Sequence, residues 1–299
     1  MINIFILNWN SANDIDGLLN SLTLSNNKAF RVILIHNGTD DWNELVGLSI
    51  KYSSKFEVHV VNNGDNLGYA GGNNAGFEYL KNNNLDGDIL ISNPDVKVLP
   101  TTLDVINYEL SLSQNVGAIM IRTLDEKGHL MYDKIKLNGL KQVYINTNER
   151  NSDTDYVAGS FFIVRREIIE SIGLFEPLFF MYWEEVDLSK RIKDIGYRLI
   201  SVTGSYVVRK SNPKSRSLNS IYYSTRNAFL MFYRHESITI IHLIKYLISM
   251  FFISFIKVFK EFNIKYLLSF ILGVKRGIGL IFFNSKNSML ELERNKNDN

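Results

Sequence analysis

Three carboxylates stand together at the start of a predicted helix, directly after a run of aromatic residues. Glu184, Glu185 and Asp187 follow segment 175–183, whose sequence is F-E-P-L-F-F-M-Y-W. Apolar walls raise the pKa of a carboxyl group towards neutral pH, where it can remove a proton from a hydroxyl group. Acids in a first helical turn are also favoured by the helix dipole alone. The segment is therefore a candidate general base, with a purely structural first turn as the alternative.

The helix that carries these acids is expected to run from Glu184 to Ile195 and to stop at Gly196. On a helix, Glu184 and Asp187 share one side, whereas Glu185 is turned by about 100° from Glu184. The two glutamates are therefore expected to do different jobs.

Polar residues follow each of four predicted strands in the first half of the chain. Short β-rich runs alternate there with amphipathic stretches, which predicts a doubly wound α/β fold with a mostly parallel sheet. The strands are residues 2–7, 31–35, 56–61 and 88–92, and the polar segments after them are residues 8–10, 36–40, 62–74 and 93–95. Ligands bind beyond the carboxyl ends of such strands. The four segments together predict a small-molecule site, although each alone is typical of an ordinary turn.

The remaining elements are expected around this edge. Apolar spacing predicts helices near residues 15–22 and 42–46, and Pro100 suits the first position of a third helix. Residues 116–121 and 161–164 are predicted strands. Residues 130–155 are polar and weakly periodic, and they are interpreted as a loop-rich insertion over the site.

The third polar segment is rich in glycine. Residues 66–76 read N-L-G-Y-A-G-G-N-N-A-G, and glycines such as Gly68 and Gly71 allow the backbone to approach a ligand closely. The last residues of the segment open a helix, whose N-terminus favours phosphate. The segment is neither a P-loop nor a G-x-G-x-x-G after the first strand, so an ATPase and a dehydrogenase lose their main support. A glycine-rich connection without a ligand is the alternative.

The fourth polar segment, Asn93-Pro94-Asp95, offers a carboxylate after an apolar strand. Magnesium commonly takes one or two protein carboxylates and fills its other positions with water and phosphate oxygens. Asp95 is therefore a candidate metal ligand, and a plain turn is the alternative.

Taken in order, these segments resemble the family 2 glycosyltransferases, particularly their rhamnosyltransferase-like branch. The resemblance covers roughly residues 1–235. The matching segments are N-W-N-S, H-N-G-T-D, the glycine-rich segment, N-P-D-V, V-A-G-S-F-F-I-V-R-R, F-F-M-Y-W-E-E-V-D-L-S-K-R and Y-Y-S-T-R-N. It implies a GT-A fold, a nucleotide-diphosphate sugar donor, a divalent cation (Mg²⁺ or Mn²⁺) and inversion at the anomeric carbon.

The resemblance also implies roles for particular residues. Glu185 matches the usual base, while Glu184 and Asp187 would hold neighbouring basic or backbone groups. Asp95 takes the place of a metal-binding acid. The positions placed at the donor are Asn8, Asn10, His36, Asn37, Gly68, Gly71, Asn74, Asn93, Arg209 and Arg226. Arg191 and Asn227 fall on recurrent positions without an assigned role.

Two positions depart from the family pattern. His36 stands where an Asp usually bonds the pyrimidine base, which leaves the nucleotide preference open. After the last core strand, Arg209 and Lys210 stand near the place of a His that often helps to hold the metal or the diphosphate. An arginine can neutralise the diphosphate directly, so weaker dependence on metal is expected.

Composition narrows the location and the partners. A formal net charge of +2 without a clustered basic face argues against nucleic acid. The chain has no cysteine, which excludes a disulfide framework and a cysteine nucleophile. The N-terminus lacks the features of a secretory signal, so the catalytic part is expected in the cytoplasm.

The C-terminal segment differs from the rest of the chain in its charge and its apolar content. Residues 238–299 carry nine Lys and Arg against four Asp and Glu, and residues 238–283 are rich in Ile, Leu and Phe. The longest stretch without charge or His runs only over residues 246–256, shorter than the roughly 20 residues that cross a bilayer. Interfacial helices are therefore expected, with a buried hairpin or a dimer contact as the alternative.

The resulting hypothesis has a GT-A catalytic domain over residues 1–235, with nucleotide-sugar binding in about 1–122 and the acceptor side in about 123–235. An amphipathic helical extension with a polar tail follows over residues 236–299 and contacts the cytoplasmic face of the inner membrane. The expected reaction moves a sugar from a dTDP- or UDP-sugar to a lipid-linked oligosaccharide of a bacterial surface polysaccharide, by resemblance. The alternatives are a sugar nucleotidyltransferase, which would need Arg and Lys in a glycine-rich loop after the first strand, and an inactive membrane-associated sugar-nucleotide-binding or scaffold protein.

Overall fold

The computed structural model describes residues 1–210 and 217–297, and within these ranges it describes the side chains of all residues except 283–297. The chain divides into two compact units. The first unit comprises Met1–Lys136, Val143–Phe180 and Glu184–Asn212. The second comprises Leu137–Gln142, Met181–Trp183 and Pro213–Asn299. The second unit therefore takes in residues ahead of the boundary expected at 235.

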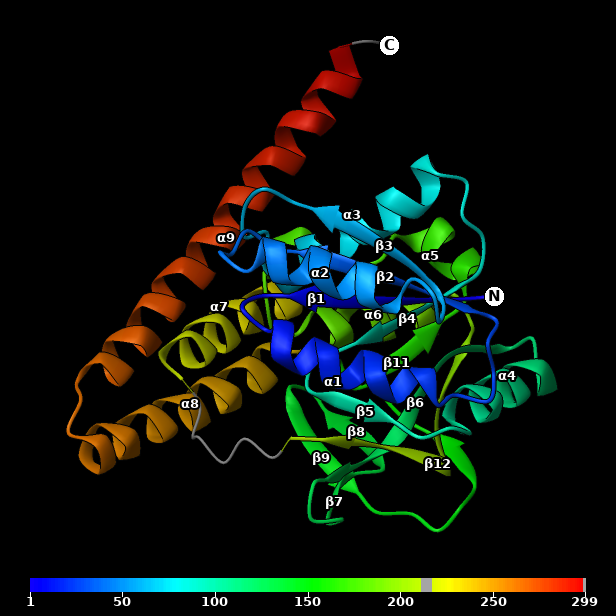
Figure 1. Ribbon diagram of the computed structural model, residues 1–299. Helices are drawn as coiled ribbons and strands as arrows, with labels where there is room; N and C mark the ends of the chain where they lie inside the picture. Colours follow the sequence, from blue (N-terminus) through cyan, green and yellow to red (C-terminus); the bar gives the residue numbers. More distant parts are fainter. Residues whose placement is uncertain (211–216, 298–299) are drawn as a thin grey trace. The chain divides into compact units, whose positions relative to one another are not determined.

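A mixed sheet forms the centre of the first unit (Figure 1). Its strands are β1 (Ile2–Asn8), β2 (Phe30–His36), β3 (Glu57–Asn62), β4 (Asp88–Ser92), β5 (Val96–Val98), β6 (Val116–Asp125), β7 (Leu130–Tyr132), β10 (Asn151–Asp153), β11 (Phe161–Val164) and β12 (Arg198–Arg209). The order is β10-β12-β6-β11-β4-β1-β2-β3, with β5 beside β12 and β7 beside β6. β4, β1, β2 and β3 are parallel neighbours, as are β6 and β12, whereas β11 runs antiparallel between β4 and β6.

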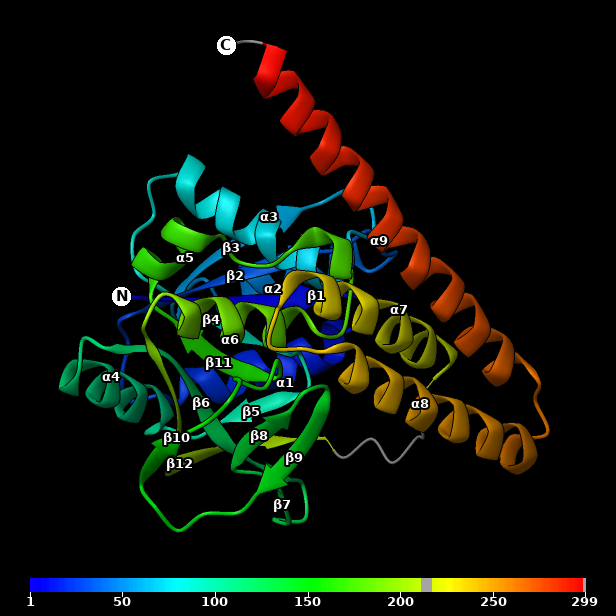
Figure 2. The ribbon, with the colours of Figure 1, turned by 180° about the vertical axis from the view of Figure 1, so that it is seen from behind.

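Helices cover both faces of this sheet (Figures 1 and 2). They are α1 (Ala12–Thr23), α2 (Trp42–Tyr52), α3 (Gly68–Asn82), α4 (Thr102–Leu112), α5 (Arg166–Ile172) and α6 (Glu184–Asp194), with a short 3₁₀ turn η1 at Pro177–Phe179. α1, α2 and α4 share one core cluster with the sheet. On the other face, Gly76 of α3 lies against Phe5, and Gly117 of β6 lies against α5 and α6. The doubly wound α/β architecture is confirmed.

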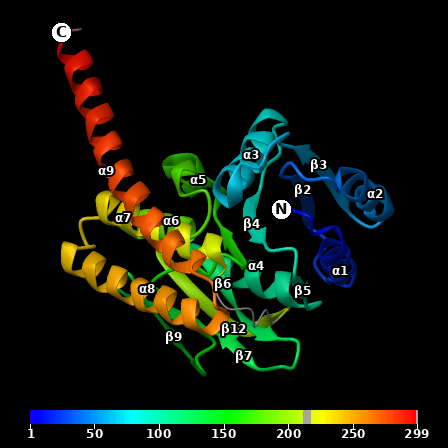
Figure 3. The same ribbon diagram turned by 90° about the vertical axis from the view of Figure 1, so that its left-hand side faces the viewer.

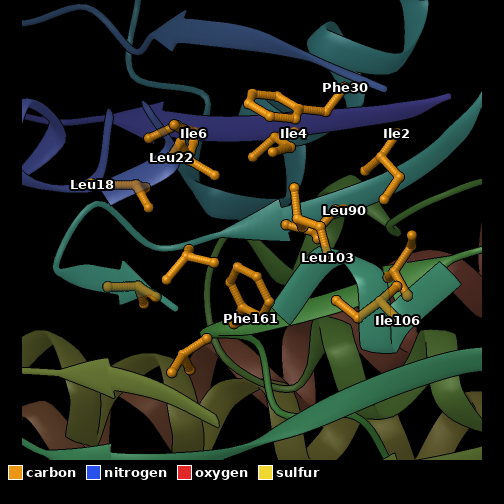
Figure 4. Packing of buried hydrophobic residues seen from close by; sticks show 14 of the residues in the cluster. Ile2, Ile4, Ile6, Leu18, Leu22, Phe30, Leu90, Leu103, Ile106 and Phe161 are labelled. Carbon is orange, nitrogen blue, oxygen red and sulfur yellow. The ribbon is translucent and has the colours of Figure 1, made fainter. Parts of the chain in front are cut away.

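The core on the α1 and α4 face is built from alternate strand residues and one stripe of each helix. Figure 4 shows Ile2, Ile4 and Ile6 of β1 pointing towards this cluster, with Leu18 and Leu22 of α1 beside them. Phe161 of β11 fills the space below β4 and is 2% exposed. Burial of such side chains contributes about 1.5–3 kcal/mol each, which makes this core the main support of the sheet edge.

Residues 130–155 differ from the expected loop-rich insertion. They contain four short strands, β7, β8 (Lys134–Asn138), β9 (Lys141–Ile145) and β10, of which β8 and β9 form their own two-stranded sheet. The prediction was wrong because the strands are three to five residues long and are held by polar groups. Asp133, fully buried, accepts from Arg122 and from the backbone N–H of Thr147.

The connection after β4 also differs from the expected one, because it contains the short strand β5. Val96–Val98 pairs antiparallel with β12, so the helix expected near Pro100 begins at Thr102. This pairing places Val96, next to Asp95, opposite Arg209.

Three helices make up most of the second unit: α7 (Leu218–Arg234), α8 (Ile240–Glu261) and α9 (Lys265–Asn297) (Figure 3). Two glycines let α9 approach α7 closely, since a Cβ on Gly273 would lie 2.8 Å from the carbonyl oxygen of Tyr222 and one on Gly277 would overlap the Phe229 ring. Ile221, Met250 and Tyr266 form a small buried cluster among the three helices.

The lysines of α8 interrupt its apolar surface less than the sequence suggests. Lys257 is 7% exposed, lies 4.7 Å from the centre of the Tyr266 ring and pairs with Glu261. Among the described helices, this 22-residue helix is long and apolar enough to cross a membrane by length and composition. The length of the uncharged stretch therefore understates this helix, and the expectation of interfacial helices stays a prediction.

Candidate active site

The ends of β1 and β2 bring Asn8 and His36 together. Both side chains are buried, and Asn8 donates from Nδ2 to Asp41 Oδ1 at 2.9 Å while its Oδ1 accepts from the backbone N–H of Ser11 at 3.0 Å. The His36 ring packs against Trp42 with 5.2 Å between ring centres. Asn10, at the exposed tip of this turn, has a left-handed φ of 52°.

Asp41 adds an acid beside His36 that the sequence interpretation missed. Its Oδ1 lies 3.9 Å from His36 Nδ1 and also accepts from the Thr39 hydroxyl at 2.5 Å. Burial favours a higher pKa of the Asp41 carboxyl, but hydrogen bonds from Thr39 and Asn8 outweigh it and hold the pKa below its ordinary value. The carboxylate oxygen Oδ2 is enclosed and has no hydrogen-bond partner among the described residues. In the sequence, the two adjacent aspartates at positions 40–41 were the sign that could have pointed to Asp41.

Asn37 shapes the glycine-rich segment from within. Its Nδ2 donates to Asn66 Oδ1 at 3.0 Å and to the carbonyl oxygen of Gly68 at 3.2 Å, and its Oδ1 accepts from the backbone N–H of Leu67 at 3.1 Å. Since the amide is buried and used on both sides, its visible function is to hold the loop before α3.

The start of α3 is tied to the aromatic segment. The backbone N–H of Ala70 donates to the carbonyl oxygen of Phe180 at 3.1 Å. Gly68 has a φ of 71°, and a Cβ there would collide with Phe180. Asn74 makes a second tie, because its side-chain amide bonds both the N–H and the carbonyl oxygen of Phe175 at 3.0 and 2.8 Å.

Glu184 and Glu185 lie at the start of α6 with their carboxyl groups hydrogen bonded to each other. Glu184 is 5% exposed, and one oxygen of each carboxyl group is fully enclosed without another partner among the described residues. Burial raises the pKa of Glu184 well above its ordinary value, and the neighbouring charge of Glu185 raises it further. Burial also raises the pKa of Glu185, whereas the hydrogen bond from Glu184 opposes that rise. The two carboxyl groups therefore titrate as a coupled pair in which burial favours the protonated form.

Tyrosines from distant segments surround this pair. The hydroxyl of Tyr69 donates to the carbonyl oxygen of Gly159 at 2.5 Å, and the Glu185 carboxyl carbon lies 3.5 Å from the position of a Cβ on Gly159. The hydroxyl groups of Tyr132 and Ser160 bond each other. Burial and the charges of the two glutamates raise the pKa of Tyr69 well above its ordinary value, so this hydroxyl stays protonated. No local sequence pattern marked these tyrosines, because each resembles a core aromatic residue.

Asp187 forms a buried ion pair with an arginine of the same helix. Its carboxylate is fully buried and accepts from Arg191 Nε at 2.8 Å. The same guanidinium donates to the carbonyl oxygens of Ile172, Gly173 and Leu174. Asp187 therefore anchors α6 to the end of α5, in line with its expected role of holding a basic group.

Asp95 and Arg209 form an ion pair at the end of β12. Arg209 Nε lies 3.0 Å from Asp95 Oδ2, and the two side chains are 31% and 23% exposed. Lys210, the next residue, pairs with Asp14 at the start of α1. The backbone N–H of Asn93 donates to the carbonyl oxygen of Ser160 at 2.8 Å, which holds the turn before Asp95.

The donor set at Asp95 fits a divalent cation that arrives with a phosphate ligand. It offers one carboxylate, and the described residues contain no group of three or more His, Cys, Asp or Glu that could hold a metal ion. Magnesium accepts one carboxylate when substrate phosphates and water complete its shell. The guanidinium of Arg209 would have to give up Asp95 when such a cation binds.

Arg226 belongs to the second unit. It donates from Nε to Asn227 Oδ1 at 2.8 Å and lies 4.9 Å from the centre of the Tyr223 ring. Its position at a donor therefore stays a prediction.

Several solved structures share the fold. S. aureus TarS 1–349 in complex with UDP-GlcNAc has a TM-score of 0.60 and 15% identity, over 94% of this chain and 83% of that chain. GalNAc-T7 with UDP, GalNAc and Mn²⁺ has a TM-score of 0.57 and 16% identity, over 76% and 47%. The mannosyltransferase PcManGT from Pyrobaculum calidifontis, with GDP-Man and Mn²⁺, has a TM-score of 0.56 and 12% identity, over 96% and 80%. These likenesses confirm the GT-A fold.

Known proteins also match by sequence. The low-salt glycan biosynthesis hexosyltransferase Agl10 of Haloferax volcanii is 24% identical over 199 residues, covering 64% of this chain and 61% of that protein. The N-acetylglucosaminyl-diphospho-decaprenol L-rhamnosyltransferase of Mycobacterium tuberculosis is 24% identical over 225 residues, covering 65% and 71%. The match thus spans about three fifths of the haloarchaeal relative.

The family match covers the strand-end loops, the glycine-rich segment and Asp95. Residues 3–173 match the family model described as Glycosyl transferase family 2, which is more than half of the 299 residues. The chain belongs to glycosyl transferase family 2.

Proposed function

We propose that this protein transfers a sugar from a nucleotide-diphosphate donor to a hydroxyl group of the acceptor, with inversion at the anomeric carbon. The observation that carries the proposal is the enclosed carboxyl pair Glu184 and Glu185 at the start of α6. A general base needs a pKa near the working pH and a position within reach of its proton, and burial supplies the first condition.

Glu185 is the base of the pair. The bond between the two carboxyl groups needs one proton, and in the proposed mechanism Glu184 carries it. The protonated Glu184 then donates to Glu185 and stabilises its ionised form. Glu185 takes the proton of the acceptor hydroxyl, whose oxygen bonds the anomeric carbon as the bond to the diphosphate breaks on the opposite face.

The leaving diphosphate gathers negative charge as that bond breaks. Arg209 is placed to donate to it, since charge-assisted hydrogen bonds to phosphate oxygens are among the strong ones. A divalent cation, Mg²⁺ or Mn²⁺, held by Asp95 would neutralise the same charge. The buried Asn8 and Asp41, together with His36, would face the nucleotide base, while Asn37 and Gly68 keep the glycine-rich segment in shape.

The substrates are proposed from the relatives. The mycobacterial relative is named for a decaprenol-linked acceptor and for rhamnose, and TarS was solved with UDP-GlcNAc. We infer a dTDP- or UDP-linked hexose or deoxyhexose such as rhamnose as donor, and a lipid-linked oligosaccharide of a bacterial surface polysaccharide, such as an O-antigen or capsule, as acceptor.

The second unit supports a peripheral location at a membrane. The outer side of α8 exposes Ile248, Phe252, Phe255, Ile256 and Phe259. A row of large apolar side chains on a helix long enough to span a bilayer matches a lipid surface. Exposed cations at the ends of α8 and on α9 complement anionic headgroups. We infer that these helices contact the cytoplasmic face of the inner membrane, where a lipid-linked acceptor resides.

The experiment compares Glu185→Gln with Glu184→Gln. We measure release of UDP or dTDP from UDP-GlcNAc or dTDP-rhamnose, with polyprenyl-diphosphate N-acetylglucosamine as acceptor. Glu185→Gln should lower turnover by about 10² or more with nucleotide affinity within a few-fold, because glutamine cannot accept the proton. Glu184→Gln should keep most of the activity, because glutamine still donates to Glu185.

The pH dependence provides the control. Transfer by the wild type should fall with decreasing pH at values above the ordinary glutamate pKa of 4.5. A carboxyl whose pKa is raised on folding lowers stability as pH rises above 4.5, so Glu184→Gln should raise Tm more at pH 8 than at pH 5. Loss of turnover in Glu184→Gln with retention in Glu185→Gln would move the base to Glu184. Wild-type protein that binds nucleotide but transfers no sugar would favour the inactive binding protein.

A further inference from the structure

The segment before the carboxyl pair has an unusual backbone. Tyr182 and Trp183 have φ of 68° and 77°, and Phe180 has φ of 62°. Large aromatic residues rarely adopt such values, and they persist only where the surroundings hold them. α6 begins at the next residue, Glu184. Residues 181–183 therefore lead directly into the helix that carries both carboxyl groups.

One asparagine of α7 holds this path. Asn227 is fully buried, and its Nδ2 donates to the carbonyl oxygens of Met181 and Tyr182, both at 2.8 Å. The indole Nε1–H of Trp183 donates to the carbonyl oxygen of Ser224 at 3.1 Å, one turn earlier on the same helix. All these contacts lie within the second unit.

The orientation of the Asn227 amide is itself determined. Arg226 donates from Nε to Asn227 Oδ1 at 2.8 Å, which leaves the amide nitrogen for the two carbonyl groups. A side-chain amide with donors and acceptor both used in a buried place is well fixed, because breaking any one bond leaves a buried polar group unpaired.

We propose that Asn227 is a positioning residue for the base: it holds residues 181 and 182 in the strained path that aims Glu184 and Glu185. This inference rests on the proposed role of Glu185. Peptide bonds join the clamped segment to Phe180 on one side and to Glu184 on the other. Asn227 thus acts through the backbone and not by touching substrate.

The test compares Asn227→Ala with Asn219→Ala, an exposed asparagine of the same helix. Asn227→Ala should lower kcat by about tenfold or more while KM for the nucleotide donor stays within a few-fold. The acid limb of its pH profile should also move, since the carboxyl groups no longer share their proton in the same geometry. The groups around the pair are Tyr69, Tyr156 and Asp187, and all are left unchanged. Asn219→Ala should match the wild type.

Hydrogen exchange followed by mass spectrometry supplies a readout that needs no turnover. In Asn227→Ala, peptides covering 180–188 should exchange at least several-fold faster while those covering 1–60 keep their wild-type rates. Trp183→Phe, which removes the indole donor and keeps an aromatic ring, should show the same local effect more weakly and serves where Asn227→Ala does not fold.

Three outcomes overturn the inference. They are unchanged local exchange in both variants, faster exchange spread over the whole chain, and a normal kcat and pH profile in Asn227→Ala under conditions where Glu185→Gln loses turnover. The last outcome leaves the proposed function intact. Absence of transfer by the wild type removes the proposed function, and local exchange then decides whether the clamp exists.

Discussion

Two side chains, Asp95 and Arg209, form the ion pair that is proposed to meet the leaving diphosphate. Asp95 and Arg209 satisfy each other at 3.0 Å, yet both are partly exposed. An ion pair of this kind contributes only about 0–1 kcal/mol to folding. Substitutions of either residue should therefore leave the protein folded and report on donor binding alone.

Asp95→Ala should remove most of the gain in UDP or dTDP affinity that Mn²⁺ brings, because it deletes the proposed ligand. Arg209→Met, which keeps the length of the side chain without its charge, should weaken nucleotide binding about tenfold with or without metal, the scale of one charge-assisted hydrogen bond. Calorimetric titration in Mn²⁺ and in EDTA measures both effects. Equal wild-type affinity in the two conditions would show that metal is not used, and Arg209 would then carry the diphosphate alone.

Residues close in sequence were the ones that could be predicted at this scale. The acids at the start of α6 and the polar residues after the parallel strands follow from local pattern. Tyr69 could not be found, because it comes from α3 and approaches the glutamates only through the fold. The 100° separation of Glu184 and Glu185 also misled in part, because flexible side chains let the two carboxyl groups come close enough to interact.

Elements position the site through a few close approaches. The start of α3 lies against Phe180 because Gly68 has no side chain and adopts a left-handed φ of 71°. Gly64, in the same loop, has a φ of 74° but open space around it. Substitution of the two glycines therefore distinguishes the free-energy cost of a side chain at positive φ from the cost of a collision with Phe180.

Gly68→Ala and Gly64→Ala should therefore differ. Both place an alanine at positive φ, which costs about 1 kcal/mol or more, but only Gly68→Ala forces α3 away from Phe180. We expect Gly68→Ala to lower Tm clearly more than Gly64→Ala and to weaken nucleotide binding at least tenfold. Thermal unfolding and calorimetry check the pair. Equal effects would mean that the contact with Phe180 contributes nothing beyond backbone strain.

The main elements were predictable because their apolar periodicity is strong, as in β1 and α1. Residues 130–155 were not, because backbone pairing and the Asp133 anchor define these strands more than any apolar alternation does. β5 was hidden for a similar reason: three residues, Val96–Val98, pair with β12 without a pattern of their own.

At the scale of the whole molecule, the second unit is the part proposed to hold the protein at a membrane. α9 packs on α7 through Gly273 and Gly277, so removal of α8 and α9 would uncover α7 and confuse the result. Point substitutions on the outer side of α8 avoid this. Phe255 and Phe259 are 42% and 62% exposed, and Ile50, 70% exposed on α2 of the first unit, is a matched control.

The full chain should float with anionic liposomes at low salt, and the double variant Phe255→Asp, Phe259→Asp should stay mostly in the soluble fraction. Two charges in place of these exposed rings remove apolar contact with lipid and repel anionic headgroups, whereas Ile50→Asp should float like the wild type. Cations near an anionic surface contribute about 1 kcal/mol each, a part that salt weakens, so raised salt should reduce flotation without abolishing it. Flotation and analytical ultracentrifugation are measured together. A wild type that stays soluble at low salt contradicts membrane contact, and a dimer that the double variant breaks would assign the same face to a second copy of the chain.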